Sequence, residues 1–156
     1  MFIKFIIPCF NVGNEVGKMM DSILNQSFKD FHIVCVDDCS TDGTMLVLQN
    51  YKDRFPDKIT LIKNDKNIGG GMSRDIGYDQ TIESAKSEYL WVVDADDKLA
   101  DKEVLHKLYV FAMNNPNLDI INIGTSFRGK HSISRAGWPI APWGRIIRAS
   151  VYVHSI

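Results

Sequence analysis

Short, nearly continuous apolar segments alternate with helix-like segments along most of this sequence. The apolar runs have the length of buried strands and are rich in β-branched and aromatic residues. The expected strands cover residues 2–7, 31–36, 59–63, 89–93 and 118–123. Strands of this kind, separated by helices, predict an α/β domain with a mostly parallel sheet.

The segments between these strands carry apolar residues at helical spacing. In residues 14–26, for example, Val16, Met20, Ile23 and Leu24 fall on one stripe. The other expected helices cover residues 44–51, residues 72–85 and a segment that Asp101 caps. A glycine loop at residues 67–71 precedes the helix of residues 72–85.

Length and charge restrict the class of protein further. A chain of 156 residues can bury one hydrophobic core but is short for two domains. The net charge of −1 lacks the basic excess of a nucleic-acid-binding domain. Lys4 and Pro8 interrupt the N-terminal apolar run, and no run approaches the roughly 20 apolar residues of a membrane span. With its odd number of cysteines, 3, the chain is predicted to be cytoplasmic with reduced thiols.

Acidic residues follow two of the expected strands. Asp38 comes after the second strand, and Asp94, Asp96 and Asp97 come after the fourth. Ligands of open parallel sheets bind at the carboxyl ends of the strands, near the switch in strand order. The strand order 3-2-1-4 would bring both groups to one crevice, where Mg²⁺ or Mn²⁺ could bridge a diphosphate. The alternative, that such residues cap helices and face water, is favoured for Asp42 and Asp101.

The glycine loop does not match a known phosphate-binding loop. Residues 67–74 read NIGGGMSR, without a Gly-Lys-Ser/Thr sequence, and Arg74 stands where a dinucleotide-binding pattern needs its last glycine. Two interpretations of Arg74 remain open: contact with a phosphate near the start of a helix, or exposure to solvent.

Five motifs in order resemble family 2 glycosyltransferases. They are IIPCFN (6–11), SILNQSF (22–28), VDDCSTDGT (36–44), NIGG through RDIG (67–77) and VDADD (93–97). The resemblance implies the GT-A type fold of nucleotide-diphospho-sugar transferases, a Rossmann-like three-layer sandwich with a mostly parallel central sheet. It assigns residues 1–125 to a nucleotide-sugar-binding core. Residues 126–156, which include PWGR at 142–145, would start an incomplete acceptor-binding region.

The resemblance also implies roles for individual residues. Asp38 would accept a hydrogen bond from the nucleotide base, and Asp96, with Asp97 second, would bind the divalent metal, Mn²⁺ or Mg²⁺. Asp75 stands where family members commonly have Asn, which puts a donor role at that position in doubt. The expected nucleotide-sugar-binding residues are Pro8, Cys9, Phe10, Asn11, Asp38, Arg74, Asp94, Ala95 and Asp96.

The implied reaction is inverting transfer of a sugar from a nucleotide-diphospho-sugar, first of all a UDP-sugar, to a saccharide or lipid-linked saccharide. In this family the general base is an acidic residue downstream of the Trp-containing segment, and no Asp or Glu follows Trp143. The base is therefore expected beyond residue 156, in a chain shortened at its C-terminus. A peripheral position at the inner membrane face stays open.

A second hypothesis is a catalytically inactive, truncated module that acts in nucleotide binding or protein association. Its interface would be the basic segment of residues 126–137 together with Trp138 and Trp143. Apolar surface left uncovered by a missing acceptor half would favour a homo-oligomer.

Overall fold

The computed structural model describes residues 1–83, 88–122, 125–127, 130–132 and 145–148. A six-stranded sheet has the order β3-β2-β1-β4-β8-β5, and β6 and β7 form a separate two-stranded sheet. The strands are β1 (Ile3–Cys9), β2 (Phe31–Asp37), β3 (Ile59–Lys63), β4 (Tyr89–Val92), β5 (Ile120–Asn122), β6 (Thr125–Phe127), β7 (Lys130–Ser132) and β8 (Arg145–Arg148). The helices are α1 (Val16–Leu24), α2 (Thr44–Arg54), α3 (Gly70–Glu83) and α4 (Val104–Asn114). The α/β fold expected from the sequence is confirmed.

The parallel half of the sheet has the predicted order. β1 lies between β2 and β4 and is parallel to both, and β3 is parallel to β2. β8 was not predicted from the sequence: it inserts between β4 and β5 and is antiparallel to both. Its sequence, RIIR, has two isoleucines between arginines, which is too short an apolar run to indicate a strand by itself.

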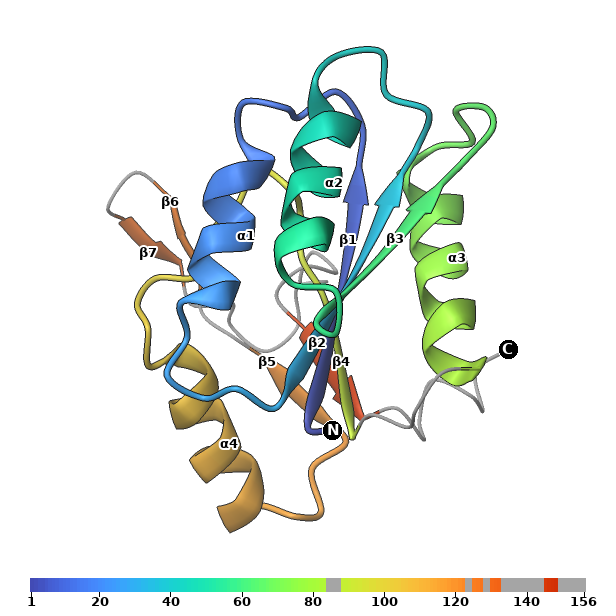
Figure 1. The fold of residues 1–156 in the computed structure, drawn as a ribbon. Helices are drawn as coiled ribbons and strands as arrows, with labels where there is room; N and C mark the ends of the chain where they lie inside the picture. The colour runs from blue at the N-terminus through green and yellow to red at the C-terminus, as the bar shows by residue number, and fades with distance from the viewer. Residues whose placement is uncertain (84–87, 123–124, 128–129, 133–144, 149–156) are drawn as a thin grey trace.

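Helices cover both faces of the sheet, as Figure 1 shows, with α1 and α2 on one face and α3 on the other. Ile3, Phe5 and Ile7 of β1 pack into the core beneath α1 and α2. Ile6 belongs to the opposite face, where α3 crosses at Gly77. Because β1 is buried on both faces, its sequence is apolar apart from Lys4 and does not alternate between apolar and polar residues.

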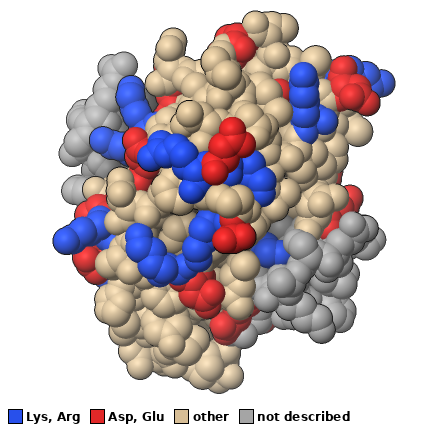
Figure 2. All heavy atoms as spheres, in the orientation of Figure 1, with Lys and Arg blue, Asp and Glu red and all other residues tan. Residues whose placement is uncertain are grey.

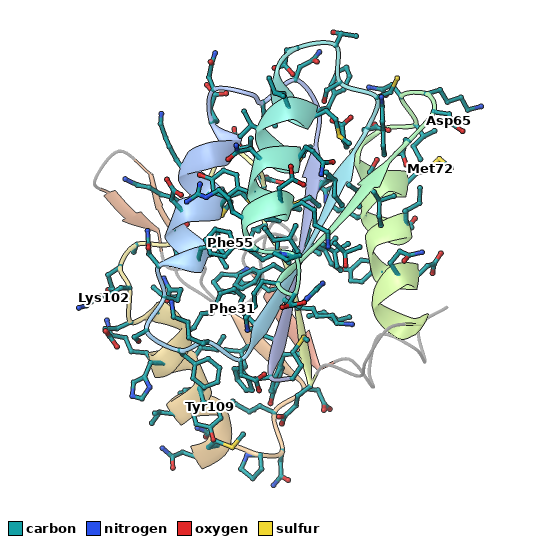
Figure 3. The ribbon with its side chains drawn as sticks, viewed as in Figure 1. Phe31, Phe55, Asp65, Met72, Lys102 and Tyr109 are labelled. Atoms are coloured by element: carbon teal, nitrogen blue, oxygen red, sulfur yellow. The ribbon has the colours of Figure 1, made fainter. Side chains whose placement is uncertain are left out.

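α4 is anchored at the N-terminal end of β1 by aromatic side chains. Tyr109 stacks on Phe28 with ring centroids 4.8 Å apart and meets Phe2 edge-on at 5.2 Å. Figure 3 shows Tyr109 on α4, together with Phe31 and Phe55 near the lower end of α2. Within the described ranges, no helix has both the length and the apolar composition that crossing a bilayer requires.

Two predicted helix starts need correction. α3 begins at Gly70, so part of the expected glycine loop is already helical. α4 begins at Val104 with Glu103 as its N-cap, two residues after the predicted cap Asp101. Asp101 instead accepts a hydrogen bond from the backbone N–H of Glu103 (2.7 Å), so it closes the turn before the helix.

Charges of both signs are interspersed on the face that carries α1 and α2. Figure 2 shows Lys and Arg side chains beside Asp and Glu on this face, without a large patch of either sign. This distribution agrees with the net charge of −1.

Tyr51 links α2 to α1. Its hydroxyl donates to the Asp21 carboxylate (2.7 Å) and lies 3.1 Å from the carbonyl oxygen of Gly17. Burial, together with the bond to Asp21, raises the pKa of Tyr51 to about 12. The folded protein therefore holds this proton more tightly than the unfolded chain does.

We expect Tyr51→Phe to lower the free energy of unfolding by about 1 kcal/mol at pH 7. Because the folded pKa is raised, the contribution of the Tyr51 hydroxyl is intact below about pH 10 and is lost as the pH rises toward 12. Urea unfolding of both proteins at pH 7 and pH 11 measures this difference. An equal difference at the two pH values would contradict the assignment.

Candidate functional site

A cleft of about 210 Å³ opens at the carboxyl ends of the parallel strands. It is lined by Pro8, Cys9, Phe10, Val12, Asp38, Gly70, Arg74, Asp94, Ala95 and Asp96. Eight of the nine nucleotide-binding residues expected from the sequence are among them, and the ninth, Asn11, is not. The topology brings these residues together because β1, β2 and β4 are neighbours and parallel, so their ends meet at one edge.

Asn11 lies just outside the cleft and joins two loops. Its φ of +52° is in the left-handed region. Its backbone N–H donates to Ser40 Oγ (3.0 Å), and its side-chain oxygen accepts from the N–H of Thr41 (2.9 Å). Asp42 makes a parallel connection, since it accepts from Gly13 N–H (3.0 Å). Asn11 and Asp42 thus fix the loop after β1 against the loop after β2.

Asp38 is buried at the back of the cleft, with 2% of its surface exposed. One carboxylate oxygen accepts from Ile68 N–H (2.9 Å) and from Asn64 Nδ2 (2.9 Å). The other accepts from Gly69 N–H (2.8 Å). Burial alone would raise the pKa of Asp38, but these bonds and one from Ser73 stabilise the charged form, and the pKa lies below its usual value. Asp38 therefore holds the start of α3 in addition to lining the cleft.

Asp38→Asn is expected to lower the free energy of unfolding by about 2 kcal/mol at pH 7, because an amide cannot accept from all these donors at once. The folded pKa of Asp38 is depressed, so its contribution is complete above the unfolded pKa of about 3.9. It is lost as the pH falls through the folded pKa. Denaturant unfolding at pH 7 and pH 3.5 should show a smaller difference between the proteins at the lower pH. A difference that grows on acidification would contradict this account.

Arg74 and Asp94 face each other across the cleft. Arg74, in the first turns of α3, places one guanidinium nitrogen 3.3 Å from Asp94 Oδ1, and both side chains are partly exposed. Within the described part of the chain, the Nε of Arg74 is buried and meets no acceptor. Arg74 thus lines the cleft with a partly exposed guanidinium, and its contact with a phosphate stays a prediction.

The acidic cluster divides between the cleft and its rim. Asp94 and Asp96 line the cleft, and Asp96 is exposed to solvent. Asp97 lies outside it, in a turn where its N–H donates to the carbonyl of Asp94 (3.1 Å). Desolvation raises the pKa of Asp97, and the charges of Asp94 and Asp96 raise it further. The repulsion among these carboxylates favours a bound cation.

The donor set fits a hard divalent ion that shares its shell with a ligand. Among the described residues, no three His, Cys, Asp or Glu side chains form a group that could hold a metal by themselves. Mg²⁺ and similar ions commonly use one or two carboxylates and take the remaining oxygens from phosphates and water. Asp96, with Asp94 beside it, offers that incomplete set.

Sequence reasoning missed the residues that support the cleft. Asn64 and Ser73 are buried, at 8% and 0% exposure. Both side chains form hydrogen bonds with the Asp38 carboxylate, and the Asn64 amide also donates to the Ser73 hydroxyl. The only available signal was their position beside the end of β3 and in the glycine-rich start of α3. The expected interface at Trp138 and Trp143, and most of residues 126–156, lie outside the described residues.

Known proteins resemble this chain both in sequence and in fold. The model of the family described as Glycosyl transferase family 2 matches residues 4–152. A poly(ribitol-phosphate) beta-glucosyltransferase of Bacillus spizizenii is 35% identical over 118 residues, which cover 74% of this chain and 18% of that protein.

Two solved structures share the fold. TarS 1–349 of Staphylococcus aureus in complex with UDP-GlcNAc superposes with a TM-score of 0.83 at 22% identity, covering 99% of this chain and 47% of that one. The mannosyltransferase PcManGT of Pyrobaculum calidifontis, in complex with GDP-Man and Mn²⁺, gives a TM-score of 0.68 at 21% identity and covers 78% of this chain and 34% of that one. The chain therefore spans less than half the length of each of these three proteins.

Proposed function

The chain belongs to glycosyl transferase family 2, and from this premise we propose that it binds the nucleotide-diphospho-sugar donor of a sugar transfer. The observation that carries the proposal is the cleft itself. One cation, Arg74, and two carboxylates, Asp94 and Asp96, converge at the strand ends around a volume of about 210 Å³. Guanidinium and metal-binding carboxylates at one site suit a diphosphate, which needs its charge neutralised from more than one side.

Each part of the cleft takes a different part of the donor in this proposal. Pro8, Cys9, Phe10 and Asp38 form the end that receives the base, where the Phe10 ring is 47% exposed and free to stack. Arg74 offers its guanidinium, which is partly exposed in the cleft, to a phosphate oxygen. Asp96 is the first ligand of a divalent cation, Mn²⁺ or Mg²⁺, and Asp97 is the second candidate.

The reaction that follows from this binding is displacement at the sugar carbon that bears the diphosphate. An acceptor hydroxyl forms the new glycosidic bond, the bond from sugar to diphosphate oxygen breaks, and the hydroxyl proton passes to a general base. The cation supplies neutralisation of the charge that develops on the leaving diphosphate. The Arg74 guanidinium stabilises the same negative charge on the diphosphate. The general base belongs to the acceptor-binding region, to which residues 126–156 would lead.

The donor and acceptor classes come from the relatives. We propose a UDP-sugar as donor, since TarS 1–349 was solved in complex with UDP-GlcNAc. We propose residues 1–125 as the part of the chain that binds this donor. The Bacillus spizizenii relative is named for poly(ribitol-phosphate), so the proposed acceptor is a saccharide or a polyol-phosphate polymer. Mn²⁺ accompanies GDP-Man in PcManGT, and this supports a divalent ion here.

Calorimetry on the purified chain tests the proposal. UDP is titrated in the presence of Mn²⁺, then in the presence of a chelator, and GDP and inorganic phosphate are titrated as controls. We expect UDP to bind more tightly than GDP or phosphate, and more tightly with Mn²⁺ than without it. If neither UDP nor GDP binds under either condition, the proposed function is wrong.

A further inference from the structure

Asn64 connects three structural elements at a point just behind the cleft. It follows the last residue of β3, and its backbone N–H donates to the carbonyl of Asp37 at the end of β2 (2.8 Å). Its side-chain amide donates to Asp38 Oδ1 (2.9 Å) and to Ser73 Oγ (3.1 Å) in the first turn of α3. Asn64 is 8% exposed and does not line the cleft. It can therefore affect a ligand only through its neighbours.

The Asp38 carboxylate connects Asn64 to the turn that precedes α3. It accepts the N–H groups of Ile68 and Gly69, and Gly69 has a φ of +88°. A left-handed φ at this position suits glycine, because a side chain would be strained there. Gly69 then accepts the helical bond from Ser73 N–H (3.1 Å). The conformation of the turn therefore depends on Asp38, and the hydrogen bond from the Asn64 amide helps to fix the Asp38 carboxylate.

Ser73 connects Asn64 to Arg74, because it bonds to the Asn64 amide and directly precedes Arg74 in the chain. Ser73 is fully buried, so the first turn of α3 cannot rotate without breaking its bond to Asn64. Arg74 leaves the same turn and reaches Asp94 across the cleft. Figure 3 shows Asp65 and Met72 on the outer side of this region, and both are exposed. The buried contact at the start of α3 is therefore on the inner side, between Ser73 and Asn64.

We propose that Asn64 is a positioning residue for nucleotide binding, which fixes Asp38 and the start of α3 so that Arg74 faces the cleft. The inference rests on the proposed binding of a nucleoside diphosphate. Removal of the amide takes one of the two donors from Asp38 Oδ1, where Ile68 N–H remains, and takes away the amide donor to Ser73 Oγ. The turn of residues 67–70 is then held by fewer contacts and gains alternative positions. In metal sites, loss of the outer-shell residues that orient the ligands typically costs about 10–100-fold in affinity or activity, and we expect an effect of similar size here.

The test is UDP binding to Asn64→Ala, measured by calorimetry with and without Mn²⁺ at a temperature where circular dichroism shows the variant folded. We expect UDP affinity to fall by about tenfold or more. The ratio of the affinities with and without Mn²⁺ should stay as in the wild type, because Asp96 is untouched. Asn64→Asp should bind still less well, since it sets a second carboxylate against Asp38.

A matched control separates positioning from stability. Gln26 is a buried amide at 0% exposure, which bonds to Ser22, Asp101 and Leu105 at the other end of the domain. Gln26→Ala should destabilise the fold and leave UDP affinity unchanged. If Asn64→Ala does not fold, Ser73→Ala removes one of the two contacts and should reduce affinity by a smaller factor.

The outcomes are distinguishable. Wild-type protein that binds neither UDP nor GDP contradicts the proposed function and, with it, this inference. Wild-type binding with unchanged affinity in the folded Asn64 and Ser73 variants overturns only the positioning role. Equal losses in Asn64→Ala and Gln26→Ala would also overturn it, because they would show a general effect of stability.

Discussion

Gly77→Val should lower the free energy of unfolding by more than about 3 kcal/mol, beyond the usual range for an overpacked core. A Cβ at this position would overlap Ile6 Cγ2 and lie 3.5 Å from Val36 Cγ2. Ile6 and Val36 are fully buried, in the central strands β1 and β2, so neither can move away without disturbing the sheet. Valine adds two further carbons to a site that has no room for one.

The sign of this effect is informative because helix propensity acts in the opposite direction. Glycine inside a helix costs about 0.5–1 kcal/mol relative to alanine, so a change away from glycine should stabilise α3 if packing did not matter. Packing must therefore outweigh propensity for the prediction to hold. Since α3 carries Arg74 into the cleft, displacement of α3 should weaken UDP binding as well.

Gly71→Val is the matched control on the same helix. Gly71 has open space around the position of an added Cβ. We expect this variant to unfold within about 0.5 kcal/mol of the wild type. Chemical denaturation of the three proteins measures both effects. A Gly77→Val protein as stable as Gly71→Val would show that α3 does not pack on β1 as described.

Asp96→Asn should remove the Mn²⁺-dependent part of UDP binding, a loss of about 100-fold or more in affinity with the metal present. Outer-shell changes alone typically cost 10–100-fold, and Asp96 is the proposed direct ligand. Asparagine keeps the size of the side chain but loses the charge that a hard cation prefers. Without metal, the variant and the wild type should bind UDP with similar affinity. Calorimetric titration in Mn²⁺ and in chelator measures both values.

Two further substitutions make this prediction specific. Asp65→Asn changes the net charge equally, at an exposed position in the turn between β3 and α3 outside the cleft, and should leave UDP binding unchanged. Asp97→Asn distinguishes the two candidate ligands, since Asp97 lies outside the cleft lining. A larger loss of metal dependence in Asp97→Asn than in Asp96→Asn would transfer the ligand role to Asp97.

Much of the fold could be predicted because the central strands β1, β2 and β4 are almost entirely buried and therefore mostly apolar. Such a run ends where polar residues begin, so the sequence also shows where the strand ends. The strand order 3-2-1-4 then sufficed to bring Asp38 and Asp94 to one edge of the sheet. The nine binding residues themselves were expected from the resemblance to family 2 glycosyltransferases, and eight of them line the cleft at that edge.

The remainder depends on contacts between residues far apart in the chain. β8 is a strand because it pairs with β4 on one side and with β5 on the other, and its own four residues do not indicate one. Asn11 follows the strand end like its neighbours, but its left-handed φ turns it to the loop of residues 40–41. Asn64 and Ser73 matter through a shared partner, Asp38, and their spacing of nine residues has no meaning without the fold.

A crystal structure of this chain with UDP and Mn²⁺ tests the central claim most directly. The account predicts an anomalous Mn²⁺ signal within coordination distance of the Asp96 carboxylate. It also predicts the diphosphate between that ion and Arg74, with the uracil ring at the end of the cleft formed by Phe10 and Asp38. Nucleotide bound elsewhere on the domain, or Mn²⁺ held away from both Asp96 and Asp97, would contradict it.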